Sequence, residues 1–232
     1  MAKIIKKNLD IVLIFGIGLF FVIVGMLGID KLIPFPTSVQ AATSAQVAVS
    51  ATVAQSEELT VTLVNSGVAV NGATTNATTT GSTVPLGTLS TGANTIAAHT
   101  LTMTTNAGSG YTVNTKYDHK LWSAAATSTK DIDDFSGSNA SPALFSGANV
   151  EAFGYTTEDF SLSETPNLPG APDRFSGGKW AAFEATNRAV AYHTGPVNAT
   201  TTKIGYQAGI SGITPAATDY GCTVTYTMTS TF

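Results

Sequence analysis

The residues best suited to chemistry form a short acidic run, Asp131, Asp133 and Asp134, within DIDDFSGSN. Alternating carboxylates followed by Gly and Asn offer the oxygen ligands that Ca²⁺ prefers. The register departs from that of an EF-hand loop, because Phe135 and Pro142 fall where oxygen ligands belong. We therefore favour a solvated loop and keep Ca²⁺ at the three carboxylates as the alternative. No other cofactor is expected.

Elsewhere in the chain, no group of acidic, serine or histidine residues has the spacing typical of a catalytic site. A carboxylate pair for glycoside hydrolysis must face across ~5–10 Å, and the loop-like pattern around Glu158, Asp159 and Glu164 does not favour such facing. The sequence also lacks the GxSxG of a serine nucleophile elbow. The histidines show no metal-ligand spacing, and we expect them on the surface or rim: His99, His119 and His193. We assign no catalytic residue and expect no enzyme activity.

Aromatic residues give a second candidate for binding. Five rings could present a platform for sugars: Trp122, Trp180, Tyr117, Tyr155 and Tyr192. Large rings in a small β domain belong more often to the core, so we expect both tryptophans there. A surface glycan is kept as an alternative partner. The single cysteine, Cys222, cannot form an internal disulfide and is expected to be a small buried hydrophobe.

An uncharged apolar run at residues 11–29 follows three lysines within the first seven positions. This charge pattern is typical of an export signal or an N-terminal membrane anchor. The small residues around Ala41 and Ala42 favour cleavage between these two alanines. Against cleavage, the run is close to the ~20 residues that span a bilayer. Both outcomes stay open, and in both residues 42–232 are exported while membrane contact is limited to 11–29.

The composition excludes one class of partner. The chain carries a net charge of −4, and only 11% of its residues are charged. Nucleic-acid binding needs a basic surface for phosphates. We therefore expect no nucleic-acid partner.

Apolar residues recur at every second position in most of the exported part, as expected for half-buried strands. The pattern predicts strands near residues 43–54, 59–63, 68–70, 96–105, 111–115, 150–155, 180–183, 189–193, 204–210 and 220–232. The turn sequence NAGSG predicts that the strands on either side of 106–110 form a hairpin. A long, irregular loop region is expected around 118–178, with an exposed stretch at 162–178.

These strands, about eight to ten in number, predict an all-β fold. We expect one antiparallel β-sandwich, immunoglobulin-like or pilin-like, over 42–232, preceded by a signal peptide or anchor helix over 1–41.

Two segments carry a resemblance. The tail ISGITPAATDYGCTVTYT, residues 210–227, resembles the closing hairpin of secreted pilin-like and spore-coat-like sandwich proteins. Residues 86–113 are similar to Thr-rich surface proteins of bacteria. The resemblance implies a surface or appendage subunit and supplies no catalytic residues.

We therefore expect an extracellular or cell-surface protein with a structural or adhesive role. Its partners would be the cell envelope or neighbouring subunits. In a pilus-like variant, the strand at 47–53 would be donated to a neighbouring subunit. An extracellular module that binds carbohydrate or Ca²⁺ is the alternative.

Overall fold

The structure is a computed structural model that describes residues 48–125, 131–145, 147–162 and 173–232. The chain divides into two units, Met1–Thr52 and Val53–Phe232, and the fold given below is that of the second. The expected export helix and the cleavage site at Ala41 and Ala42 lie outside the described residues. Within the described residues, no helix is long and apolar enough to cross a membrane.

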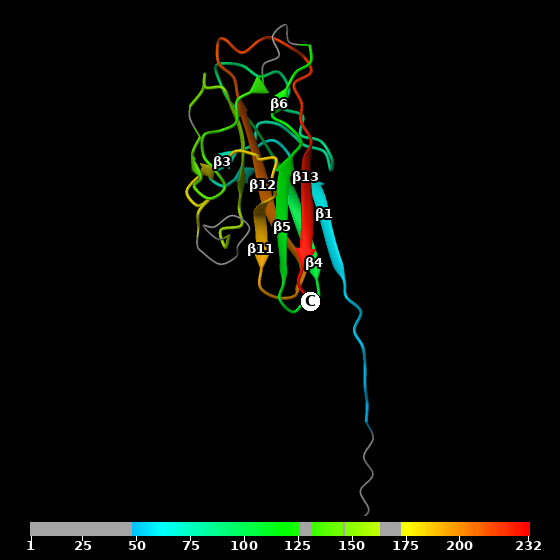
Figure 1. Cartoon of the computed structure of the whole chain (residues 1–232). Helices are drawn as coiled ribbons and strands as arrows, with labels where there is room; N and C mark the ends of the chain where they lie inside the picture. Colours follow the sequence, from blue (N-terminus) through cyan, green and yellow to red (C-terminus); the bar gives the residue numbers. More distant parts are fainter. Residues whose placement is uncertain (1–47, 126–130, 146, 163–172) are drawn as a thin grey trace, which may run out of the picture. The chain divides into compact units, whose positions relative to one another are not determined.

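The described part of the chain is all-β, as predicted, and its largest sheet has four antiparallel strands in the order β1-β4-β12-β9. Figure 1 labels three of its strands, β1, β4 and β12. The sheet is held by the long central strands β4 and β12, which pair over most of their length. Its members are β1 (Glu57–Leu63), β4 (Thr95–Thr105), β12 (Val197–Gly209) and β9 (Ala152–Thr157).

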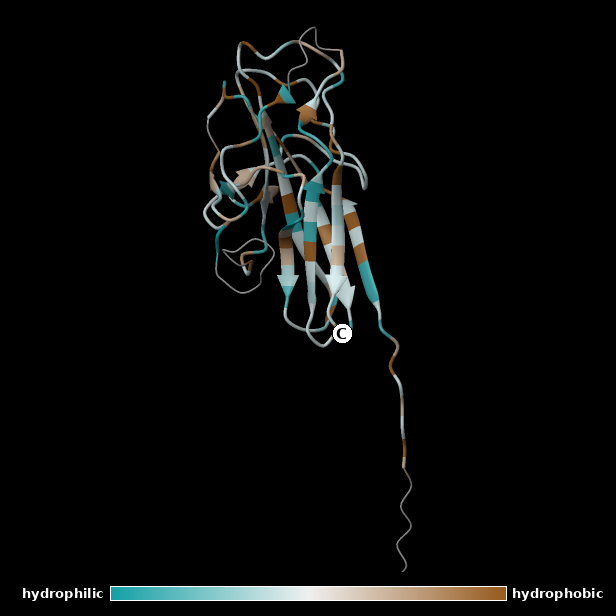
Figure 2. Ribbon diagram, viewed as in Figure 1, coloured by the Kyte–Doolittle hydropathy of each residue, from teal (hydrophilic) through white to brown (hydrophobic). Residues whose placement is uncertain are grey.

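A second antiparallel sheet has three strands in the order β11-β5-β13. They are β11 (Arg188–His193), β5 (Tyr111–Tyr117) and β13 (Val224–Ser230). In β13, the exposed Thr225, Thr227 and Thr229 alternate with half-buried or buried residues, which is the predicted pattern of one wet and one packed face. Figure 2 shows comparable alternating bands of hydropathy along the neighbouring strands.

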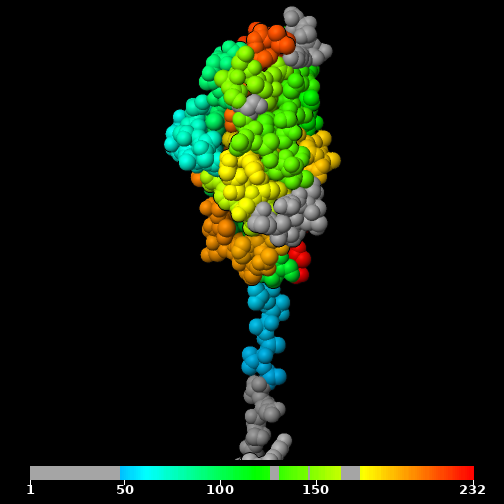
Figure 3. All heavy atoms as spheres, turned by 90° about the vertical axis from the view of Figure 1, so that its left-hand side faces the viewer, coloured from blue at the N-terminus to red at the C-terminus, as the bar shows by residue number. Residues whose placement is uncertain are grey.

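Short two-stranded pairs lie outside these sheets. They are β2 (Ala69–Val70) with β3 (Ala73–Thr74), β6 (Leu121–Trp122) with β7 (Asp131–Ile132), and β8 (Ala143–Leu144) with β10 (Lys179–Trp180). Three of these six strands belong to the predicted loop region 118–178, which covers one face of the unit (green and yellow in Figure 3).

The main core draws on both larger sheets. Leu101 and Met103 of β4 join Tyr206 of β12, and Val113 of β5 joins Val190 of β11, in one buried cluster. Aromatic rings pack against one another in this cluster, and those of Tyr155 and Phe183 are tilted by 38° with centroids 4.7 Å apart. Such contacts are worth about 0.5–1.5 kcal/mol beyond area burial.

The predicted hairpin across residues 106–110 is wrong in its pairing, although both of its strands exist. β4 pairs with β1 and β12, whereas β5 pairs with β11 and β13. Gly110, with a φ of 76°, makes the turn by which the chain leaves one sheet for the other. β12 and β13 likewise belong to different sheets, so residues 210–227 do not form the closing hairpin that the resemblance implies.

Two further expectations need correction. Residues 48–56 form no strand, whereas the alternation of valines predicted one at 43–54. The stretch 162–178 is not simply an exposed loop, because Leu162, Arg174 and Phe175 are buried.

Candidate functional site

The three residues of the acidic run lie in different surroundings. Asp131 lies in β7, opposite Trp122 in β6. Asp133 is exposed, and its carbonyl oxygen accepts a hydrogen bond from the backbone of Phe153 at 2.8 Å. Among the described residues, no group of three or more His, Cys, Asp or Glu side chains is placed to hold a metal ion.

Asp134 is the member of this run that is engaged by the fold. Its carboxylate accepts a hydrogen bond from the Tyr117 hydroxyl at 3.0 Å and lies 3.8 Å from the Lys120 ammonium. Burial raises the pKa of Asp134, and burial together with the nearby Asp134 charge raises the pKa of Tyr117 to about 12. These contacts anchor β5 to the acidic loop.

The two tryptophans have different positions. Trp180 is buried, as predicted, and packs edge-on against Phe145 with centroids 5.8 Å apart. Trp122 is 38% exposed, so its placement in the core was wrong. Its ring lies edge-on to His119 at 6.1 Å. Trp122 is therefore the exposed ring of the predicted platform, since Tyr117 and Tyr192 are partly buried and the other two rings are buried.

His99 contradicts the expectation of a surface histidine, because it is buried in β4 between the two sheets. Its Nε2–H donates to the Thr80 carbonyl at 2.6 Å, so Nδ1 accepts from the Tyr206 hydroxyl at 3.0 Å. The Tyr206 hydroxyl lies 2.7 Å from that of Tyr226 in β13. This chain of hydrogen bonds joins β4 and β12 to β13, and burial lowers the pKa of His99.

A second buried polar group was also missed by sequence reasoning. The Asn139 amide donates to the Tyr155 hydroxyl and to the Ala189 carbonyl, and its oxygen accepts from the Arg174 guanidinium at 2.6 Å. Burial lowers the pKa of Arg174. The three partners of Asn139 come from β9, β11 and the start of the described segment 173–232. This group therefore fastens the loop segments that carry Asn139 and Arg174 to a strand of each larger sheet.

Cys222 is partly buried and packs against the core, close to what was predicted. Burial raises the pKa of its thiol to about 12. The thiolate that reacts in redox chemistry is therefore scarce at neutral pH.

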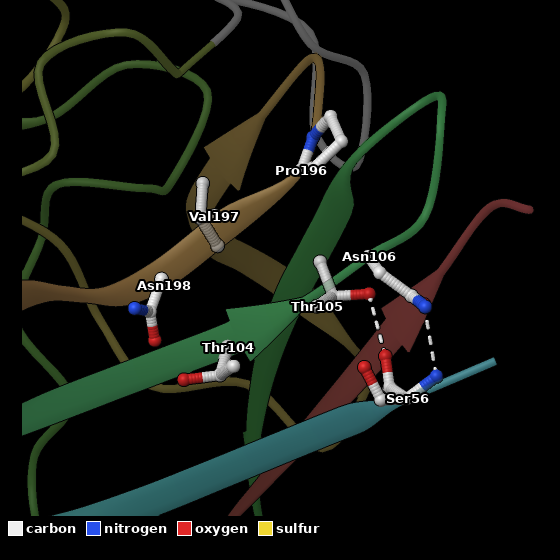
Figure 4. A pocket seen from close by; sticks show the side chains of 7 residues that line it. All are labelled: Ser56, Thr104, Thr105, Asn106, Pro196, Val197 and Asn198. Atoms are coloured by element: carbon white, nitrogen blue, oxygen red, sulfur yellow. Dashed lines mark hydrogen bonds between the residues drawn. The ribbon is translucent and has the colours of Figure 1, made fainter. Parts of the chain in front are cut away.

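The residues that precede β1 are clamped by Asn106. Its side-chain oxygen accepts from the Ser56 backbone N–H at 2.9 Å, and its amide donates to the Ala54 carbonyl at 2.7 Å. The Thr105 hydroxyl donates to the Ser56 carbonyl at 3.0 Å. Figure 4 shows the two hydrogen bonds to Ser56 beside a shallow hollow that Pro196, Val197 and Asn198 also line. We call Asn106, Thr105 and their contacts with residues 54–56 the Asn106 clamp.

Beyond the clamp, the chain exposes apolar side chains at alternate positions. Val49 is 89% exposed and Val53 is 82% exposed, with Ala51 between them. We call residues 48–54 the N-terminal segment. Its pattern is that of a strand, but residues 48–56 pair with no strand in the described part of the chain.

The comparisons give no relative. No family model, curated protein or solved structure matches this chain.

Proposed function

We propose that the protein is an exported structural or adhesive subunit of the cell surface, built on a β-sandwich and joined to its neighbours by the N-terminal segment. The sandwich is inferred from the two antiparallel sheets that share one buried cluster. Export is inferred from the lysines and the apolar run at residues 11–29.

The observation that carries this proposal is the exposure of the N-terminal segment. Leaving a valine in water instead of in a core costs about 1.5–3 kcal/mol. Val49 and Val53 are both exposed, and they lie at the spacing that places side chains on one face of a strand. Addition to the edge of a sheet in another subunit would satisfy both their side chains and the backbone between them.

The outer faces of the sheets suit a wet, uncharged surface. Thr60, Thr102 and Thr201 lie side by side across β1, β4 and β12. β-branched Thr tolerates extended backbone and presents a hydroxyl to water. A protein with many such positions can form a durable surface layer without a large apolar exterior.

Export and processing are tested on protein from the native cells. We expect intact cells treated with an external protease to lose the protein, and N-terminal sequencing to give Ala42 as the first residue. An N-terminus at Met1 or Ala2 would instead give a membrane-anchored ectodomain. Full protection from the protease until the cells are lysed would contradict the surface location.

An extracellular carbohydrate-binding module is the second candidate, and the exposed Trp122 ring favours it. A sugar would stack on this ring beside His119. Isothermal titration with cell-surface polysaccharide tests it: binding by the parent protein and its loss in Trp122→Ala would support this function. Equal heats for both proteins would reject it.

A further inference from the structure

We propose that the N-terminal segment of one copy adds as a strand to the surface between β1 and β13 of a second copy. This inference rests on the proposed function, because it names the partner surface that strand donation requires. We call this surface the β1–β13 seam and define it by Leu59 and Val61 of β1 and by Val224 and Tyr226 of β13.

The free edges of both sheets meet at this seam. β1 is the last strand of the four-stranded sheet, and β13 is the last strand of the three-stranded sheet. The two strands approach each other at one end, where the Ser230 backbone N–H donates to the Glu57 carboxylate at 3.3 Å. Within the part of the chain that the structure describes, no strand pairs with the outer edge of either one. The Ser230 N–H is thus engaged by a side chain at one end, and along the rest of the seam a further strand can pair with β1 or β13.

The opposite edges are closed. The outer edge of β9 exchanges two backbone hydrogen bonds of 2.8 Å between Tyr155 and Ala181, and Phe153 is bonded to Asp133 and Phe135. The edge of β11 is capped by side chains, because the Tyr192 N–H donates to the Asp159 carboxylate at 2.6 Å. Capped and covered edges are how proteins prevent unwanted strand pairing. Among the described residues, no paired strand covers the β1–β13 seam in this way.

The closed edge at β9 is also more deeply buried than the β1–β13 seam. All six residues of β9 are buried. By contrast, the core-facing side chains of the seam pack against the main cluster but are only partly buried: Leu59, Val61, Val224 and Tyr226. A strand that brings Val49, Ala51 and Val53 to this surface would cover an apolar strip with apolar side chains.

The Asn106 clamp explains why a second copy is the recipient. The carboxamide of Asn106 pairs with Ser56 and Ala54 as a backbone peptide of a neighbouring strand would, which extends the β1–β4 ladder beyond Glu57. Residues 54–56 are therefore held in line with β1. No turn is present at residues 48–56.

The test uses the compact unit Val53–Phe232, whose seam has no donor, and a fluorescent synthetic peptide of residues 43–54. We expect saturable binding that Val61→Lys weakens at least about tenfold, because a charge on an apolar strip is desolvated. Thr60→Lys places the same charge on the outer face of the same strand, and we expect it to bind like the parent.

A second pair of variants keeps the test decisive if Val61→Lys does not fold. If Val61→Lys unfolds by circular dichroism, Val224→Lys and its outer-face control Thr225→Lys give the answer from the other sheet. Peptide binding that is unchanged by both seam variants would overturn the seam as acceptor and leave strand donation standing. No peptide binding to any of these proteins would overturn both the seam and the donated strand.

Discussion

At the scale of single residues, the interior depends on polar side chains that bridge the sheets. Asn139 satisfies Tyr155, Arg174 and the Ala189 carbonyl together. Asn139→Ala leaves these buried groups without their partner, and we expect a loss of about 3 kcal/mol in the free energy of unfolding. Urea denaturation measures it. Ser136→Ala, at an exposed position in the same loop, should change stability by less than about 0.5 kcal/mol.

His99 gives the fold a dependence on pH. Burial lowers the pKa of His99 below the ~6.5 of an unfolded chain. The unfolded state therefore binds the proton more readily, so the contribution of His99 to stability is complete above about pH 6.5 and declines as the pH falls further.

We expect the denaturation midpoint to fall between pH 7 and pH 5. In His99→Gln this fall should be smaller, while His119→Gln, at an exposed site, should retain it. Parallel pH profiles for the parent and His99→Gln would contradict the assignment of this effect to His99.

The acidic run is testable at the same scale. The carboxylate of Asp134 is already engaged by Tyr117 and Lys120. We therefore expect the same melting temperature in EDTA and in millimolar Ca²⁺, since a ligand that binds only the folded state would raise it. A rise with Ca²⁺ that is absent in Asp133→Asn would establish calcium at Asp131, Asp133 and Asp134.

At the scale of elements, the strands were easier to predict than their partners. Alternation located β1, β5 and β13, because the period-two pattern is local. Which strands pair with each other depends on residues far apart in the sequence. β4 and β5 are joined by a short turn, yet they belong to different sheets. A turn sequence such as NAGSG fixes a reversal of the chain but does not decide whether the next strand stays in the same sheet.

The candidate site was predictable to a similar degree. The exposed valines were visible as an alternating run, but their lack of a partner strand was not. The Asn106 clamp and the partly buried seam depend on contacts between residues far apart in the sequence, as with Asn106 and Ala54. His99 was misplaced because a single histidine carries no signal of burial when its partners are as distant as Tyr206.

The turn between β4 and β5 makes a prediction about these elements. Gly110 has a φ of 76°, and a Cβ there would collide with the His193 carbonyl. We expect Gly110→Ala to destabilise the fold by at least about 3 kcal/mol. Gly108→Ala, in the same turn, meets no atom within 4 Å and should be nearly neutral. Thermal melts of the two proteins compare them directly, and equal melting temperatures would contradict the role of this turn.

At the scale of the whole molecule, the two sheets differ at their edges: one edge of each sheet is covered, and the other lies at the β1–β13 seam. Loops and paired strands cover the β9 and β11 edges, while in the described part of the chain no strand pairs with the outer edges of β1 and β13, which carry half-buried apolar side chains. The N-terminal segment supplies matching apolar residues at strand spacing. Together these features favour copies that join in one direction, each giving a strand and receiving one.

Sedimentation velocity of the chain beginning at Ala42 tests this most directly. We expect assemblies larger than a monomer that grow with concentration. Val49→Asp with Val53→Asp should leave monomers, because both charges fall on the face that would be buried. Ser50→Asp with Thr52→Asp adds the same charge on the other face and should still assemble. A parent protein that stays monomeric at high concentration would contradict assembly through the N-terminal segment.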